Sequence, residues 1–219
     1  MKESSKNNNV LLSISIITYN QPNEIKRLLS GILPQMRPGV EVVINDNSEN
    51  SETESIVAKE FNSSYVRYFK NKINVGAEKN LLLAIERSFG EYVWWFGDDI
   101  MTSGAIDAIL KIIKNGRYNF IFTNFYIADQ GAGKPVVVFD SDKIFNNGSD
   151  VLENISNVLG FASSTILRKN CLPDINGKEV NKFMGSGYIN FYLVLYVLSL
   201  PGLFYACSYP YVGACPTPP

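Results

Sequence analysis

The sequence of 219 residues contains no histidine, and this absence excludes several kinds of chemistry. Histidine is the commonest metal ligand of proteins and a frequent general base near neutral pH. A Ser-His-Asp triad is therefore excluded, and any bound metal ion must be a hard cation with oxygen ligands. The three cysteines, Cys171, Cys207 and Cys215, form no C-x-x-C pair. Neither a zinc site nor a disulfide framework is expected, and reduced thiols are the simpler interpretation.

The sequence also lacks an excess of charge of either sign. It has 20 lysine and arginine residues against 21 aspartate and glutamate residues, which gives a formal net charge of −1. Binding to nucleic acid usually shows as a basic excess, so nucleic acid is not expected as the main partner. A hydrophobic fraction of 46% and a charged fraction of 19% are those of an ordinary globular protein. The length suits one large domain, or one domain with a small appendage.

A long hydrophobic run is missing as well. The most apolar stretch begins at Ile189, and its unbroken part of about twelve residues is shorter than the roughly twenty that span a bilayer. This stretch predicts a buried helix, with a helix facing the membrane surface or an acceptor as the alternative. The first nine residues, MKESSKNNN, lack the apolar core of a signal peptide. We therefore expect a cytoplasmic protein, with peripheral contact at the inner face of the membrane left open.

Apolar β-branched runs alternate with helical patterns through roughly the first 125 residues. This alternation predicts an α/β fold with a mainly parallel sheet covered by helices on both faces. The expected strands are 11–19, 40–46, 65–70, 91–96 and 118–128, and the expected helices are 20–33, 51–61, 76–89 and 103–115.

The second half of the chain has a less regular pattern. Strands are expected at 136–140 and 163–169, a short helix at 150–159, and the apolar helix from about residue 186. No repeat or interdomain linker is visible. The final residues, CPTPP, are typical of a coil or of a cut end rather than of a packed terminus.

Three of the expected strands end in polar residues. These endings are Tyr19-Asn20, Asp46-Asn47-Ser48 and Asp98-Asp99. In open α/β sheets, ligands bind in the crevice at the carboxyl ends of the strands, so these endings predict a binding site. No G-x-G-x-x-G or G-x-x-x-x-G-K-[ST] pattern is present, which excludes a dinucleotide-binding Rossmann motif and a P-loop.

Three groups of candidate residues have two interpretations each. Asp46 is free to accept a hydrogen bond from a nucleobase or a ribose hydroxyl, or it opens an Asx-turn. Lys79, in the first turn of a helix, would be favoured there by a bound anion, or it is simply solvated. Asp98 and Asp99 suit Mg²⁺ or Mn²⁺, or they are an acidic pair before a helix N-terminus.

Four motifs taken in order resemble the inverting glycosyltransferases of family 2, which have the GT-A fold. The motifs are SIITYN from Ser15, EVVINDNS, NVGAEKN and GEYVWWFGDDI. The resemblance is good over 11–127 and looser over ASSTILRKN. The last two motifs resemble most the abequosyltransferase-type members, which build bacterial surface polysaccharides such as lipopolysaccharide.

The resemblance implies a division of the chain within a single domain. A polar tail, 1–10, precedes a nucleotide-sugar-binding half, 11–127, with a Rossmann-like sheet. An acceptor-side half of the same domain, 128–219, follows, and its C-terminus is either complete or truncated.

The resemblance also implies roles for individual residues. The metal ion, Mn²⁺ or Mg²⁺, would be held by Asp99, while Asp98 would contact the ribose or the sugar. The nucleobase pocket would be lined by residues of the first strand end, Asp46 would accept a hydrogen bond from the nucleobase, and Lys79 would approach the nucleobase or the diphosphate. The implied substrate-binding set is Thr18, Tyr19, Asn20, Asp46, Asn47, Lys79, Asn80 and Asp98.

The sequence departs from the family pattern at two places. Asn45 stands where the family has the first acid of its second motif. Many members carry Glu-Asp near the start of the late helix, where this chain has Ser186-Gly187. An inverting transfer needs a general base, normally a carboxylate, to deprotonate the acceptor hydroxyl. Asp174 and Glu179 are the nearest carboxylates in the sequence, and Asp174 is the expected catalytic residue.

We therefore expect a glycosyltransferase that moves a sugar, with inversion, from a nucleotide-sugar donor to a glycan or lipid-linked glycan acceptor. Two alternatives stay open. One is a donor-binding domain without catalysis, which the missing Glu-Asp pair favours. The other is a nucleotidyltransferase, although TYNQPNEIKR lacks the glycine-rich basic loop that such an enzyme needs after its first strand.

Overall fold

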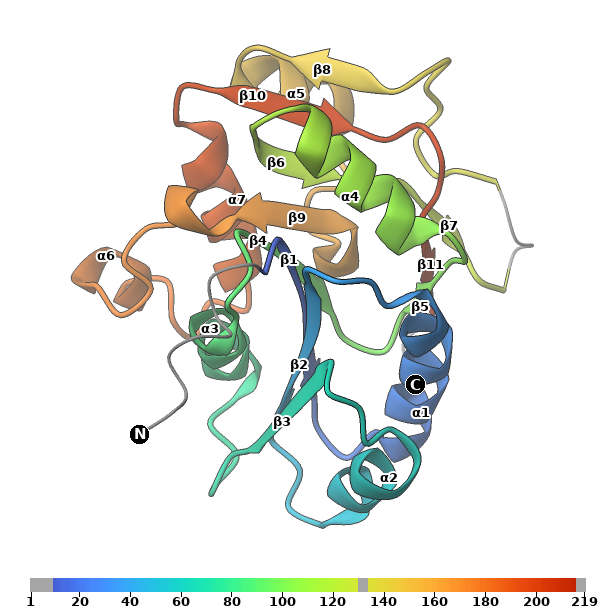
Figure 1. The fold of residues 1–219 in the computed structure, drawn as a ribbon. Helices are drawn as coiled ribbons and strands as arrows, with labels where there is room; N and C mark the ends of the chain where they lie inside the picture. The colour runs from blue at the N-terminus through green and yellow to red at the C-terminus, as the bar shows by residue number, and fades with distance from the viewer. Residues whose placement is uncertain (1–9, 130–133, 216–219) are drawn as a thin grey trace.

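The computed structural model describes residues 10–129 and 134–215. Most of the expected N-terminal tail and the last four residues of the chain therefore lie outside the described part. The described residues form an eight-stranded sheet and a three-stranded sheet, with helices packed around the larger one (Figure 1). The expected α/β architecture is confirmed.

The large sheet has the order β3-β2-β1-β4-β9-β6-β10-β8. Strands β3, β2, β1 and β4 run parallel to one another, as do β6 and β10. Strand β9 is antiparallel to both of its neighbours, and β8 is an antiparallel edge strand. The sheet is thus mainly parallel, as expected. Its strands are β1 (Leu12–Thr18), β2 (Val40–Asp46), β3 (Val66–Lys70), β4 (Tyr92–Phe96), β6 (Tyr118–Phe122), β8 (Lys143–Phe145), β9 (Thr165–Arg168) and β10 (Leu203–Ala206).

Helices cover the large sheet on both faces. Figure 1 shows α3 and α7 on one side of the sheet and α1, α2 and α4 on the other. The apolar spacing of α1 buries four side chains, each worth about 1.5–3 kcal/mol relative to exposure. The helices are α1 (Pro22–Ile32), α2 (Glu52–Glu60), α3 (Ala77–Arg87), α4 (Ala105–Asn115), α5 (Gly148–Ile155), α6 (Lys178–Asn181) and α7 (Ile189–Leu198), with short 3₁₀ turns η2 (Leu33–Gln35), η3 (Ala162–Ser164) and η4 (Lys169–Cys171).

The apolar helix expected after residue 186 is α7, which packs on β6 and β9. It buries Leu193, Val194 and Val197, while Leu195 and Tyr196 stay about one-third exposed. Within 10–129 and 134–215, the chain forms no helix with the length and apolarity that a membrane crossing requires.

The structure differs from the expected strands at two places. The expected strand 118–128 is broken at Asn124 into β6 and β7 (Phe125–Ile127), because the Asn124 amide bonds to the backbone N–H and C=O of Val137. The small sheet then joins β7 to β5 (Ile100–Met101) and β11 (Val212–Ala214). The expected strand 136–140 is wrong, since these residues form bends instead.

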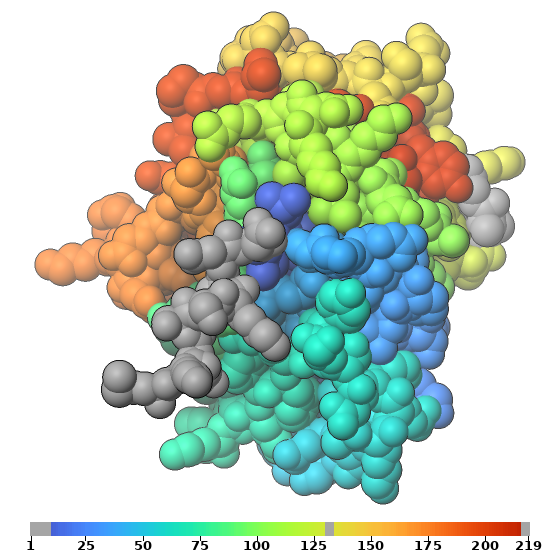
Figure 2. Space-filling model, in the orientation of Figure 1, coloured from blue at the N-terminus to red at the C-terminus, as the bar shows by residue number. Residues whose placement is uncertain are grey.

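The two halves of the chain share the large sheet. Strand β6, from the first half, pairs with β9 and β10 from the second. Figure 2 shows the blue-to-teal residues at one end of the molecule and the yellow-to-red residues at the other, with green residues between them. The chain therefore forms one continuous body.

The strand register brings three strand ends to one edge of the sheet. Thr18 pairs with Asp46, and Ile16 pairs with Phe96, which directly precedes the Gly97-Asp98-Asp99 turn. Because these strands are parallel, their carboxyl ends open into the same crevice.

Candidate active site

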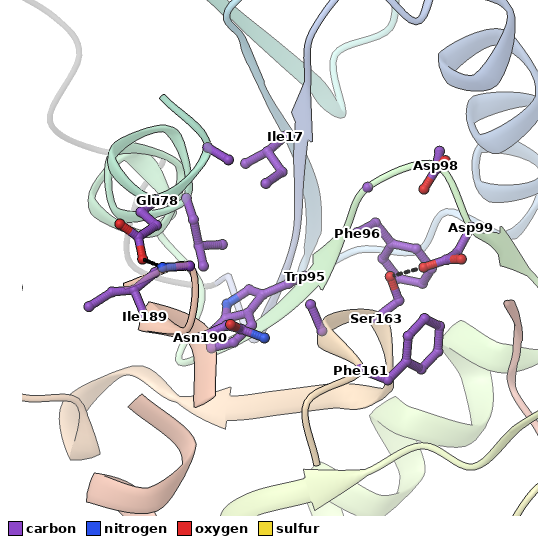
Figure 3. Close-up of a pocket in the computed structure, with 15 residues that line it drawn as sticks. Ile17, Glu78, Trp95, Phe96, Asp98, Asp99, Phe161, Ser163, Ile189 and Asn190 are labelled. Carbon is purple, nitrogen blue, oxygen red and sulfur yellow. Dashed lines mark hydrogen bonds between the residues drawn. The ribbon is translucent and has the colours of Figure 1, made fainter. Parts of the chain in front are cut away.

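Two neighbouring pockets lie at this edge and share the lining residues Ile17, Ala77 and Gly97. The first, here called the amide pocket, has a volume of about 280 Å³ and is also lined by Thr18, Tyr19, Gln21, Asn47, Asn74, Gly76 and Asn80. The second, here called the carboxylate pocket, has a volume of about 290 Å³ (Figure 3). Its further lining residues are Glu78, Leu81, Trp95, Phe96, Asp98, Asp99, Phe161, Ala162, Ser163, Gly187, Ile189 and Asn190.

The amide pocket begins at the end of β1. Thr18 is 4% exposed, and its hydroxyl has no hydrogen-bond partner among the described residues. Tyr19 beside it is 44% exposed. A buried hydroxyl normally has a partner, and Thr18 lines the amide pocket, where its hydroxyl is open to a hydrogen bond from water or a ligand.

Asn20 shapes the turn after β1 and lies outside both pocket linings. Its φ of 52° is left-handed, a conformation that asparagine tolerates better than most residues. Its backbone N–H donates to the Ser48 hydroxyl at 2.8 Å. Asn20 therefore joins the end of β1 to the turn after β2.

Asp46 is fully buried and has both carboxylate oxygens engaged. One oxygen accepts the Ser48 N–H at 2.7 Å, which is the Asx-turn interpretation, and the other accepts the Tyr68 hydroxyl at 2.5 Å. Burial, the hydrogen bond to Asp46 and its negative charge raise the pKa of Tyr68. The structure does not bring the Asp46 side chain into either pocket lining.

A network of side-chain amides holds the wall of the amide pocket. Asn45 donates to Asn80 at 2.5 Å, and Asn71 donates to Asn47 at 2.7 Å and to Asn80 at 2.8 Å. Arg87 donates to the Asn45 amide oxygen. Asn45 thus both donates and accepts, which the carboxylate of the family pattern would not do.

Lys79 and Asp174 lie apart from the two pockets. The Lys79 ammonium is 3.5 Å from the Asn176 amide oxygen, on the side of α3 that faces the loop before α6. Asp174 is exposed, and its carboxylate accepts the Asn176 N–H at 3.1 Å. Glu179, the other nearby carboxylate, pairs with Lys182 at 2.7 Å. The structure brings none of these three side chains into a pocket lining.

Asp99 is held from two sides at the end of β4. It is 6% exposed and accepts the Ser163 hydroxyl at 2.5 Å and the Cys215 N–H at 2.9 Å. Burial raises the pKa of Asp99, the two hydrogen bonds oppose this, and the neighbouring Asp98 adds to it. The contacts of Ser163 and Cys215 have no signal in the sequence, because these residues lie 64 and 116 positions away.

The pair Asp98 and Asp99 is suited to a divalent cation whose remaining ligands come from water and a diphosphate. Neither carboxylate forms an ion pair within residues 10–129 and 134–215. The same residues contain no group of three or more acidic, cysteine or histidine side chains suited to a metal ion. Mg²⁺ is commonly held by one or two carboxylates together with water and substrate phosphates, so the pair is sufficient.

The tandem tryptophans have different roles. Trp94 is fully buried and donates its indole N–H to the Ser163 carbonyl at 2.8 Å, which joins β4 to η3. Trp95 points to the other face and lines the carboxylate pocket (Figure 3). It is 1% exposed, and its indole N–H has no partner among the described residues.

Glu78 is a lining residue that the sequence analysis missed. It lies in the first turn of α3, and its carboxylate accepts the Gly187 N–H at 2.7 Å, the Ser186 hydroxyl at 3.3 Å and the Gly185 N–H. Figure 3 shows Glu78 across the pocket from Asp98 and Asp99. The only sequence signal for this contact was indirect, namely a Gly-Ser-Gly segment where an acid was expected.

Comparison with known proteins places the chain among sugar-transferring proteins. The family model described as "Glycosyl transferase family 2" matches residues 13–165. The chain is 25% identical over 216 residues to "Abequosyltransferase RfbV" of Salmonella typhimurium, covering 88% of this chain and 62% of that protein. It is also 32% identical over 125 residues to an "Uncharacterized glycosyltransferase" of Rickettsia felis, covering 55% of this chain and 20% of that protein.

The fold is similar to that of solved GT-A structures. S. aureus TarS 1-349 superposes with a TM-score of 0.77 at 19% identity, covering 94% of this chain and 60% of that chain. TarS 1-349 in complex with UDP-GlcNAc gives a TM-score of 0.74 at 19% identity, covering 96% of this chain and 60% of that one. The expected GT-A fold is confirmed. The chain spans about three-fifths of the length of RfbV and of TarS 1-349.

Proposed function

This chain belongs to glycosyl transferase family 2, and from that premise we propose that it transfers a sugar from a nucleotide-sugar donor to a glycan acceptor. The observation that carries the proposal is the pair of joined pockets at the ends of β1, β2 and β4. Hydroxyl and amide groups stand among the apolar lining of one pocket, and three carboxylates stand among the apolar lining of the other. We assign the nucleoside to the first and the diphosphate-sugar to the second.

The nucleoside of the donor occupies the amide pocket in this proposal. The exposed ring of Tyr19 stacks on the nucleobase, and the unpartnered hydroxyl of Thr18 bonds to its polar edge. Asn47 and Asn80 line the same pocket, with their amides already fixed by the network around Asn45. Asp46 acts through the turn that it closes rather than by direct contact.

The diphosphate lies toward Asp98 and Asp99, with Asp99 as the ligand of Mn²⁺ or Mg²⁺. Such an ion neutralises charge on the leaving diphosphate and makes it a better leaving group. Ser163 and the Cys215 N–H keep the Asp99 carboxylate in one orientation. Lys79 reaches the diphosphate in this proposal only after leaving its contact with Asn176.

The sugar and the acceptor are proposed from the relatives. RfbV is named for the transfer of abequose, and TarS 1-349 was solved with UDP-GlcNAc. We propose a hexosyl or deoxyhexosyl donor, transferred with inversion to a glycan or lipid-linked glycan in bacterial surface polysaccharide synthesis. The amide groups of the pocket accommodate either a pyrimidine or a purine, so the nucleobase is left to experiment.

A second function is favoured by one observation. The loop before α7 carries Gly185-Ser186-Gly187 and no carboxylate, so a domain that binds the donor without catalysis is the alternative. Donor-dependent turnover by the purified protein would eliminate this alternative.

Calorimetric titration tests donor binding. The protein is titrated with UDP, GDP, CDP and dTDP, each in Mn²⁺ and in EDTA, and the series is repeated on Asp99→Asn. We expect one nucleotide to bind, with its affinity reduced at least about tenfold by EDTA and by the substitution, because both remove the cation from the diphosphate. Absence of binding by all four nucleotides in Mn²⁺ would contradict the proposed donor site.

A further inference from the structure

The loop between α6 and α7 contacts the first turn of α3, where it donates hydrogen bonds to the Glu78 carboxylate. Gly185 and Gly187 have φ values of 86° and 79°, a left-handed conformation that favours glycine. In this conformation both backbone N–H groups point to Glu78, together with the Ser186 hydroxyl. The loop that lacks an acid of its own therefore holds an acid from another element.

We propose that Glu78 is the general base that deprotonates the acceptor hydroxyl, an inference that rests on the proposed function. Among the described residues, the carboxylates that line the carboxylate pocket are Glu78, Asp98 and Asp99. Asp98 and Asp99 belong to the diphosphate side. In an inverting displacement the acceptor attacks from the face opposite the leaving group, and Glu78 lies across the pocket from that pair (Figure 3).

The contacts of Glu78 orient its carboxylate and leave it able to accept a proton. A carboxylate has about four lone-pair sites. One oxygen accepts from Gly187 and Ser186, and the other accepts from Gly185 alone, so this second oxygen keeps a free site.

With Glu78 as the base, each bond and proton of the transfer step can be followed. The acceptor hydroxyl oxygen forms a bond to the anomeric carbon of the donor sugar, and its proton passes to the Glu78 carboxylate. The bond from the anomeric carbon to the diphosphate oxygen breaks, and its electron pair leaves with the nucleoside diphosphate. The configuration at the anomeric carbon inverts. Asp174, exposed in its turn, lines neither pocket and takes no part in this step.

Replacement of Glu78 by Gln is the direct test, with Glu86→Gln as the matched control. Glu86 is an exposed glutamate on the same helix and lies outside both pockets. The first measurement is calorimetric affinity for the nucleoside diphosphate that the wild type binds. The second is the release of that nucleoside diphosphate from its nucleotide-sugar, with water as the acceptor. We expect Glu78→Gln to keep its affinity and to release product at least about 100-fold more slowly, since general base catalysis contributes about 10²–10⁴-fold.

Azide distinguishes a catalytic role from a role in holding the loop. Azide attacks the anomeric carbon without losing a proton, so it needs no general base. We expect sodium azide to restore nucleoside diphosphate release by Glu78→Ala and to yield a glycosyl azide of inverted configuration. A variant that has lost only the position of the loop would not be rescued.

Each outcome has one meaning. Release by Glu78→Gln within about tenfold of the wild type, or a loss that azide does not restore, would overturn the assignment of Glu78 while leaving the proposed function in place. A wild type that binds donor and releases no product would overturn both the base and the transfer. A wild type that binds none of the four nucleotides in Mn²⁺ would contradict the proposed function itself.

Discussion

Three carboxylates line one pocket, and their surroundings separate their roles. Asp99 is buried and held by Ser163 and the Cys215 N–H, Asp98 is half-buried, and Glu78 is held by the loop before α7. A bound cation would stabilise the charge of the buried Asp99 carboxylate. Glu78 is half-buried on the opposite wall of the pocket. The chemical difference between these acids comes from their neighbours.

The two tryptophans of β4 allow a matched comparison at the residue scale. Both are almost fully buried, but Trp94 donates a hydrogen bond to the Ser163 carbonyl, and Trp95 has no partner among the described residues. We expect Trp94→Phe to lower the free energy of unfolding by about 1 kcal/mol more than Trp95→Phe does, because only the first change removes a buried hydrogen bond, the one to the Ser163 carbonyl.

Urea denaturation followed by circular dichroism gives both free energies of unfolding. Because each change removes the same ring atoms from the core, the difference between the variants isolates the hydrogen bond. A larger destabilisation by Trp95→Phe would show that the Trp95 indole has a partner in the folded protein.

At the scale of elements, a buried strand positions Asp98 and Asp99. Every residue of β4 is buried, and the strand lies between β1 and β9. The Trp94 indole joins β4 to η3, and η3 supplies Ser163 to Asp99. The aromatic residues before Asp98 and Asp99 therefore fix the position of these acids, because close-packed interiors have low compressibility.

The corner between β8 and β10 gives a prediction for pH. Burial would raise the pKa of Asp142, but hydrogen bonds from the Ser208 N–H, the Tyr205 hydroxyl and the Ser208 hydroxyl outweigh it and hold the pKa below its ordinary value. A carboxylate with a lowered pKa in the folded state contributes stability above its unfolded pKa of about 3.9, and this is lost as pH falls through the folded value.

We therefore expect Asp142→Asn to lower the melting temperature at pH 7 and to flatten its decline at acidic pH. Differential scanning calorimetry of both proteins from about pH 7 to about pH 3 measures the two slopes. Equal slopes for the variant and the wild type would show that Asp142 does not contribute to the acid sensitivity of this corner.

The strands and helices of the first half were predictable because their patterns are local. Apolar runs and helical spacing identify β1 to β4 and α1 to α4 within a few residues. The break at Asn124 was not predictable, because its amide bonds to Val137, thirteen positions away. The antiparallel course of β9 likewise depends on pairing with β4 and β6, which its own residues do not specify.

At the scale of the whole molecule, the site was predicted in part. The structure brings Thr18, Tyr19, Asn47, Asn80, Asp98 and Asp99 to the two pockets, since strand ends converge by the rule for parallel sheets. The prediction of Asp174 rests on sequence proximity, which does not determine distance in the fold, and this residue lines neither pocket. Glu78 lies 107 positions from the loop glycine that it contacts, so no local pattern could reveal it.

The proposed sugar transfer is tested most directly by the release of nucleoside diphosphate from UDP-GlcNAc and from nucleotide-activated abequose in Mn²⁺. If the chain performs this transfer, the wild type releases nucleoside diphosphate from at least one nucleotide-sugar, and release falls at least about 100-fold in Asp99→Asn and in EDTA. Binding of the donor without any release would contradict the proposed transfer. The chain would then be a nucleotide-sugar-binding domain without transferase activity.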